Sequence, residues 1–178
     1  AVILNDRLNH VNNSLNGRLI NGNNLDVMYA LLEAGHKGKF DLIYLDPPYF
    51  SQSNYISKIK IASQTGEKFI SRNVFTDYWP NLDDYLNYIW PILSVSRELL
   101  SDKGSLFVHA DWHASHYIRI ILDEIFSLEN LVNEIVWCYG GGSNAKRHFH
   151  RKHDTILWYA KTKNYIFNPI YRPYSKKT

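Results

Sequence analysis

The sequence contains a single cysteine, Cys138, so no disulfide can form within the chain. Its first residues lack the charged segment and apolar run that mark a secretory signal. No apolar stretch approaches the roughly 20 residues that a membrane-spanning helix needs. We therefore expect a soluble, cytoplasmic protein in a reducing compartment, with no membrane partner.

Several common catalytic patterns are also missing. The sequence has no Gly-Lys-Ser/Thr loop to cradle phosphate, and no Ser-His-Asp or Cys-His arrangement stands out. It has no internal repeat or obvious linker. With 178 residues, of which 45% are hydrophobic, the composition is that of one ordinary globular domain.

Charge is unevenly distributed along the chain. The net charge is +3, but residues 143–178 carry nine basic side chains against Asp154 alone, and residues 1–142 have an acidic excess. Tyrosine and phenylalanine alternate with the basic residues of this last segment. The mixture suits a polyanion with stackable bases, because basic groups contact phosphates and aromatic faces accept unstacked nucleotides. A solvated basic face is the alternative.

Hydrophobic periodicity indicates strands alternating with helices, which predicts an α/β open sheet. We expect helices capped by Asn24, Asn81 and Asp111, the first ending at Gly35 and the second kinked at Pro91. Residues 50–80 show no clear period and are predicted to be a long surface loop. The segment Gly140-Gly141-Gly142-Ser143-Asn144 is too short to hold a helix, so the last two strands should form an antiparallel hairpin around a basic loop, 140–153. The expected strands are 18–21, 40–45 (buried and parallel), 105–110, 134–139 and 154–161.

The sequence Asp46-Pro47-Pro48-Tyr49 directly follows the apolar strand 40–45. In an open parallel sheet, ligands bind at the carboxyl ends of the strands. Two prolines fix the backbone, which leaves the Asp46 carboxylate and the Pro47 carbonyl as acceptors for an exocyclic amine. Tyr49 offers a face on which a flipped base could stack. The alternative is that Pro-Pro-Tyr only ends a strand and turns the chain.

These four residues resemble the catalytic motif of amino-methyltransferases, which transfer methyl groups from S-adenosylmethionine to exocyclic nitrogens. The similarity to N6-adenine DNA methyltransferases extends over residues 18–174. The sequence is similar to the group of these enzymes in which the catalytic motif precedes the cofactor motif, as in many type III modification subunits. The supporting segments are Asn21-Gly22-Asn23-Asn24-Leu25, Phe75-Thr76-Asp77, Arg97-Glu98-Leu99-Leu100, Gly104-Ser105-Leu106-Phe107-Val108, Ile135-Val136-Trp137, Ala145-Lys146-Arg147, the run from His153 to Lys161, and Phe167-Asn168.

The resemblance implies a Rossmann-like methyltransferase domain and a role for each motif residue. Asp46 and the Pro47 carbonyl would accept the two hydrogens of adenine N6, and Tyr49 would stack on the flipped base of double-stranded DNA. Asn23 and Asp46 would lie at the S-adenosylmethionine site. A restriction subunit or a second copy of the chain is the expected protein partner. The residues expected to hold phosphates are Lys146, Arg147, His150, Arg151 and Lys152.

The sequence departs from the family pattern in two places. The Gly-rich Phe-x-Gly-x-Gly segment that wraps the cofactor is absent from these 178 residues, and Gly22-Asn23 replaces the usual Gly-Asp. The resemblance therefore implies an incomplete catalytic portion of a restriction-modification methyltransferase, with residues 1–178 as one partial domain. The alternatives are a non-catalytic DNA-binding or assembly fragment with an exposed edge at the Asp46 strand, and an enzyme acting on RNA or cytosine N4.

Histidines and acids also gather after the strand 105–110. Imidazole and carboxylate groups could bind Zn²⁺ or Mn²⁺. However, His113 and His116 lie three residues apart on the first turn of a predicted helix, and no cysteine or second acidic cluster completes a ligand set. We therefore expect no metal at His109, Asp111, His113 and His116, and we expect His150 and His153 to support the hairpin or contact phosphate.

Overall fold

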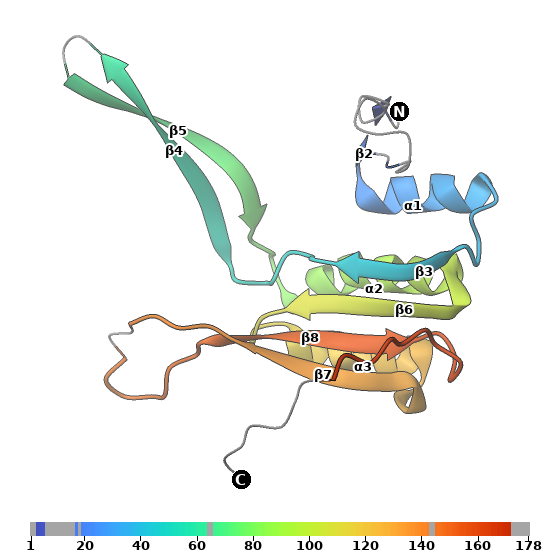
Figure 1. The fold of residues 1–178 in the computed structure, drawn as a ribbon. Helices are drawn as coiled ribbons and strands as arrows, with labels where there is room; N and C mark the ends of the chain where they lie inside the picture. The colour runs from blue at the N-terminus through green and yellow to red at the C-terminus, as the bar shows by residue number, and fades with distance from the viewer. Residues whose placement is uncertain (1–2, 6–16, 18, 64–65, 143–144, 172–178) are drawn as a thin grey trace.

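The computed structural model describes residues 3–5, 17, 19–63, 66–142 and 145–171. Its centre is a four-stranded sheet in the order β3-β6-β8-β7 (Figure 1). The strands are β3 (Phe40–Leu45), β6 (Leu100–Ala110), β7 (Leu131–Cys138) and β8 (His153–Ala160).

The sheet is mixed. β3 and β6 are parallel, whereas β8 is antiparallel to both β6 and β7. The predicted α/β open sheet and its C-terminal antiparallel hairpin are therefore confirmed. The 14 residues between β7 and β8 form no helix at the described positions 139–142 and 145–152, and the chain returns directly as an antiparallel strand.

Two helices cover one face of the sheet, α2 (Leu82–Leu99) and α3 (Ser115–Phe126) (Figure 1). Apolar residues at helical spacing, such as Tyr85, Ile89 and Leu93 of α2, pack against Leu106 of β6. They are completely or almost completely buried. This burial of apolar surface is the main force that holds helices and sheet together.

A third helix, α1 (Asn24–Glu33), packs on α2, with Met28 buried in a second apolar cluster to which β3 also contributes. Its N-cap is Asn23, whose side chain accepts hydrogen bonds from two backbone N–H groups, so the prediction of Asn24 was one residue late. Gly35 follows the helix with a φ of 83°, as expected for a helix end. Before α1, β1 (Ile3–Asn5) pairs with β2 (Leu19–Asn21), and Arg18 of the predicted strand lies outside the described residues.

The prediction that the strand 40–45 is buried was wrong. Leu42 and Tyr44 are 61% and 53% exposed, because β3 is an edge strand and no described helix covers that face of it. The exposed sheet edge required by the assembly-fragment alternative is therefore present in the described part of the chain.

The prediction of a long loop over residues 50–80 was also wrong. β4 (Ser53–Ser63) and β5 (Gly66–Asp77) form an antiparallel hairpin, which we call the arm, and it extends away from the sheet (Figure 1). Its polar composition hid the strands, because backbone hydrogen bonds between two paired strands do not require an alternating apolar pattern.

The structure corrects one further boundary. Asp111 does not cap α3, which begins at Ser115 with Ala114 at its N-cap position. The Asp111 carboxylate instead accepts a hydrogen bond from the His113 backbone N–H at 2.9 Å, which forms a turn ahead of the helix. Asn81 caps α2 as predicted, and Pro91 lies inside that helix. A 3-10 turn, η2 (Leu128–Asn130), leads into β7. None of the described helices is long and apolar enough to cross a membrane.

Candidate functional site

The Asp46–Tyr49 motif lies where two parallel strands end. Leu45, the last residue of β3, pairs in register with Val108 of β6. The carboxyl ends of parallel strands meet at one edge of a sheet, so the turn after β3 lies beside the end of β6. This arrangement brings His109 to the motif.

Three side chains are in direct contact at this edge. The Tyr49 hydroxyl donates a hydrogen bond to Asp46 Oδ1 at 2.5 Å, and it lies 3.0 Å from His109 Nδ1. Asp46 Oδ1 and His109 Nδ1 are 3.5 Å apart. Burial and the neighbouring Asp46 carboxylate raise the pKa of Tyr49, which keeps its hydroxyl protonated as a donor. The Asp46 side chain is 61% exposed, so it remains open to a ligand.

A second carboxylate lies on the other side of the histidine. His109 Nε2 is 3.4 Å from Asp154 Oδ2, and the Tyr139 hydroxyl donates to Asp154 Oδ1 at 3.4 Å. Desolvation and the Asp154 charge raise the pKa of Tyr139. No sequence motif predicted a role at this site for His109, Asp154 or Tyr139. Their only sequence signal is their position near the ends of strands that converge here.

Two buried side chains hold the backbone of the turn that follows β3. Tyr85 of α2 donates its hydroxyl hydrogen to the Pro48 carbonyl at 2.9 Å. Asp77, only 2% exposed, accepts hydrogen bonds from the backbone N–H groups of Phe50 at 2.9 Å and Ser51 at 2.6 Å. Phe50 has a φ of 60°, a conformation that is uncommon for a residue with a side chain. The buried carboxylate holds this backbone and ties the motif to the base of the arm.

Asn23, the predicted cofactor-binding residue, lies at the N-terminal end of α1, on the same side of the molecule as the carboxyl end of β3 (Figure 1). Its side-chain oxygen caps the helix through Leu25 N and Asp26 N at 3.0 and 3.3 Å. A groove of about 300 Å³ between α1 and β3 includes Gly22 and Leu45 in its largely apolar lining. Asn23 and Asp46 are the immediate neighbours of those two residues in the chain.

The predicted phosphate-binding residues lie on the segment that joins β7 to β8, at the same end of the sheet as Asp46 (Figure 1). Lys146, Arg147 and His150 are exposed. Arg151 is exposed too, with its guanidinium carbon 4.0 Å from the centre of the Trp112 ring. The carbonyl of the half-buried Lys152 accepts a hydrogen bond from Tyr139 N at 3.1 Å, which extends the hairpin beyond its strands.

Two of the histidines considered as metal ligands contact carboxylates. His109 contacts Asp46 and Asp154, while His113 Nδ1 lies 2.5 Å from Asp111 Oδ2. Within the described ranges, no group of three or more potential ligands is placed to hold a metal ion.

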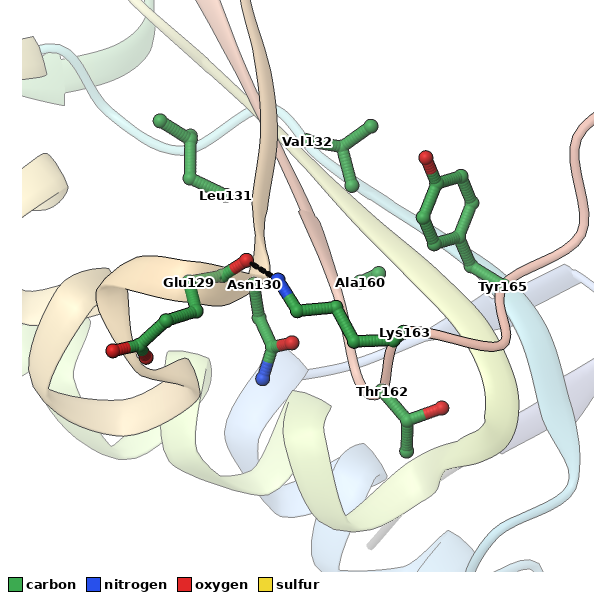
Figure 2. A pocket seen from close by; sticks show the side chains of 8 residues that line it. All are labelled: Glu129, Asn130, Leu131, Val132, Ala160, Thr162, Lys163 and Tyr165. Carbon is green, nitrogen blue, oxygen red and sulfur yellow. Dashed lines mark hydrogen bonds between the residues drawn. The ribbon is translucent and has the colours of Figure 1, made fainter.

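A cavity of about 170 Å³ lies at the opposite end of β7 and β8. Figure 2 shows the Lys163 amine bonded to the Glu129 carbonyl, while the Glu129 carboxylate points away from it. The amine that could bind a ligand there is therefore already occupied by the backbone, and the cavity shares no residue with the Asp46 site.

Comparison with known proteins identifies the family of the chain. A family model described as "DNA methylase", which covers N6 and N4 methylases, matches residues 40–178. The chain belongs to this DNA methylase family. The predicted relationship to type III modification subunits is confirmed, since several of these proteins are among its relatives.

Relatives of the chain include type II and type III proteins. The chain is 35% identical over 147 residues to type II methyltransferase M.EcaI of Enterobacter cloacae, which covers 80% of this chain and 29% of that protein. It is 24% identical over 162 residues to the EcoP15I Mod subunit of Escherichia coli. This match covers 84% of this chain and 25% of that protein. The chain thus spans between a quarter and a third of the length of these relatives.

The fold also has a counterpart among solved structures. The crystal structure of the M1.HpyAVI–SAM complex matches with a TM-score of 0.50 and 16% identity, over 86% of this chain and 60% of that one. The mixed sheet of the chain is therefore part of a fold shared with that structure.

Proposed function

We propose that this chain is the catalytic portion of an S-adenosylmethionine-dependent DNA methyltransferase that acts on adenine N6. The observation that supports this most directly is the exposed Asp46 carboxylate at the carboxyl end of β3, held by the Tyr49 hydroxyl. A fixed acceptor at this position suits an amino group that enters from solvent.

The motif would work by positioning the amine. The Tyr49 hydroxyl binds one Asp46 oxygen, which leaves lone pairs of the exposed carboxylate for an N–H of the acceptor. Tyr85 already occupies the Pro48 carbonyl, so the Pro47 carbonyl is the candidate acceptor for the second N–H. Two fixed acceptors orient the nitrogen lone pair and stabilise the positive charge that develops as the nitrogen becomes tetrahedral.

When bound, S-adenosylmethionine would supply an electrophilic methyl group, which leaves its sulfur as the nitrogen forms the new bond. Asn23 and Asp46 flank the end of the groove between α1 and β3, and its apolar lining suits one side of a nucleoside-bearing cofactor. Asn23 would bind through its amide NH₂, because its oxygen caps α1. The Gly-rich segment expected from the family would come from outside these 178 residues.

Basic groups on two sides of Asp46 suit double-stranded DNA as the partner. The segment that includes Lys146, Arg147, His150, Arg151 and Lys152 lies at one side of the strand ends. The arm lies at the other, and its strands contain four basic residues and only Glu67 as an acid before Asp77. Phosphate contacts from both would hold the duplex while the target base stacks on Tyr49.

An assembly fragment that binds DNA without catalysis is the second candidate. The observation in its favour is the open edge of β3, with Leu42 and Tyr44 exposed. An unpaired strand of this kind accepts another strand, from the same protein or from a second copy. Cytosine N4 and RNA acceptors would use the same Asp46 site.

Binding to an extrahelical base separates these functions. The probe is a short duplex with adenine opposite an abasic site, compared with one in which purine, lacking the amino group, replaces that adenine. We expect the chain to prefer adenine by about 10-fold or more, the value of a lost hydrogen bond to a charged group. Asp46→Ala should abolish the preference, whereas Asp102→Ala, which removes an exposed carboxylate elsewhere, should keep it.

Equal affinity for the two duplexes would overturn the catalytic function in favour of the assembly fragment. A greater preference for extrahelical cytosine or for an RNA strand would replace adenine as the acceptor. Calorimetric titration of S-adenosylmethionine into the chain and into Asp46→Ala then tests the cofactor site. Binding that weakens in the variant supports the assignment of Asp46, and equal binding by both proteins would contradict it.

A further inference from the structure

Four side chains form a continuous row from the candidate acceptor site into the sheet. The Tyr49 hydroxyl contacts Asp46 Oδ1 at 2.5 Å on one side and His109 Nδ1 at 3.0 Å on the other. His109 Nε2 then lies 3.4 Å from Asp154 Oδ2. Exposure falls along the row, from 61% for the Asp46 side chain to 21% and 19% for those of His109 and Asp154.

The geometry restricts where hydrogens can lie. Both nitrogens of His109 face oxygen atoms, and Tyr49 has one hydrogen to share between Asp46 and His109. When the row holds three hydrogens, two arrangements satisfy every contact. In the first, Asp46 is a carboxylate that accepts from Tyr49, and His109 carries hydrogens on both nitrogens. In the second, Asp46 is protonated and donates to Tyr49, Tyr49 donates to His109 Nδ1, and His109 carries one hydrogen, on Nε2. Moving hydrogens through the Tyr49 hydroxyl interconverts them.

We propose that His109, held by Asp154, is a positioning residue that receives through Tyr49 the proton lost by the methylated amine. This inference rests on the proposed function, because the amine must release one proton for each methyl group that it gains. It adds a destination for that proton, which Asp46 alone does not provide.

One proton moves from the methylated amine to His109 in three steps. At the start Asp46 is a carboxylate and His109 is neutral, with its hydrogen on Nε2 facing Asp154. The methylated nitrogen gives its proton to Asp46, Asp46 passes a proton to the Tyr49 oxygen, and Tyr49 passes its own to His109 Nδ1. Asp46 is then a carboxylate again, and the imidazolium is stabilised by the Asp154 carboxylate. His109 is exposed enough to release the proton to water.

The surroundings favour this path. From β8, Asp154 places a negative charge against the ring, and from β7, Tyr139 donates to Asp154 and keeps that carboxylate oriented. From the turn after β3, Asp46 and Tyr49 face Nδ1. Tyr44, on β3, acts electrostatically on Tyr49, and Asp111, after β6, acts on Tyr139. The Lys152 amine lies farther out, 5.9 Å from the centre of the Tyr139 ring. The charged groups in direct contact with the His109 ring are the carboxylates of Asp46 and Asp154, which favour an imidazolium.

Nitrogen-15 NMR of the histidine side chains tests the row in the chain itself, without cofactor. At alkaline pH we expect His109 to carry its hydrogen on Nε2. Tyr49→Phe should shift the Nδ1 resonance towards that of a nitrogen without a hydrogen bond, and Asp154→Asn should remove the preference for Nε2. A hydrogen on Nδ1, or resonances unchanged in both variants, would overturn the inference.

In the methylating enzyme that contains this chain, His109→Ala should slow a single turnover by roughly 100-fold or more. Added imidazole should restore part of the rate, increasingly so as pH rises, because only neutral imidazole accepts a proton. An unchanged rate, or a slow one that imidazole does not restore, would count against the relay. Preference for extrahelical adenine should persist in His109→Ala. If the unaltered chain showed no preference for extrahelical adenine, the proposed function itself would be refuted.

Discussion

Tyr85, completely buried on α2, donates its hydroxyl hydrogen to the carbonyl oxygen of Pro48 at a distance of 2.9 Å. This bond joins the helix layer of the core to the turn that carries the Asp46 motif. Pro47 and Pro48 have no N–H groups, so at these two positions a carbonyl is the only backbone group that a core side chain can hold.

Tyr85→Phe should lower the free energy of unfolding by about 1–2 kcal/mol, because the Pro48 carbonyl loses its partner while the ring still fills the core. Urea unfolding followed by circular dichroism measures the change. Tyr88→Phe, on the same helix, is the control and should change stability by less. Equal effects of the two substitutions would show that the bond to Pro48 does not stabilise the fold.

Asp77→Asn should destabilise the protein by about 1.5–3 kcal/mol, since a charged acceptor of two backbone hydrogen bonds is replaced by an amide with one oxygen. The fluorescence of Trp79 should change as well, because its indole N–H lies 3.4 Å from Asp77 Oδ1. Chemical unfolding and emission spectra give the two readings. Asp102→Asn is the control, because its side chain is 88% exposed and the substitution should have little effect.

The double substitution Lys146→Ala, Arg147→Ala should weaken binding to duplex DNA and reduce the dependence of affinity on salt. Removing two phosphate contacts lowers the slope of log affinity against log salt by about 1.8. Fluorescence anisotropy over a salt series measures both quantities. Lys39→Ala, Lys103→Ala removes the same charge at the opposite end of the sheet, and a similar loss there would argue for a diffuse electrostatic effect.

Stability should fall as pH rises above about 10, the ordinary pKa of tyrosine. Burial, and a hydrogen bond that Tyr159 donates to Asp123 at 2.5 Å, raise the pKa of Tyr159 in the folded protein. The unfolded chain therefore loses this proton first, so the stabilisation is complete below the unfolded pKa and is lost towards the folded one. Tyr159→Phe should make the decline less steep when unfolding is measured from neutral to alkaline pH. A decline of the same steepness in the variant would contradict this assignment.

Local sequence was sufficient where the structure depends on neighbouring residues. The apolar strand 40–45 followed by two prolines predicted a strand and a turn, and Asn81 predicted the start of α2, because caps and strand ends involve contacts within a few residues. The same local pattern could not show that β3 is an edge strand with Leu42 and Tyr44 exposed, since a continuous apolar run does not reveal which of its residues are covered.

The arm shows why the prediction failed for residues 50–80. Hydrophobic periodicity detects a strand when one of its faces packs on a core, and the arm strands pair mainly with each other. Ser53 pairs with Asp77 and Ser63 with Gly66, so backbone hydrogen bonds join the two strands along the whole hairpin. The composition of residues 50–80 therefore resembled that of a loop.

The sequence by itself determined the family and placed Asp46 and Tyr49 at the end of a strand. Only the tertiary structure brought His109 to Tyr49, 60 residues away, and Asp154 to His109, 45 residues away. These contacts arise from strand order, because β6 lies between β3 and β8 and their relevant ends meet at one edge. Strand order is set by the packing of the whole sheet against α2 and α3, which no short segment of the sequence encodes.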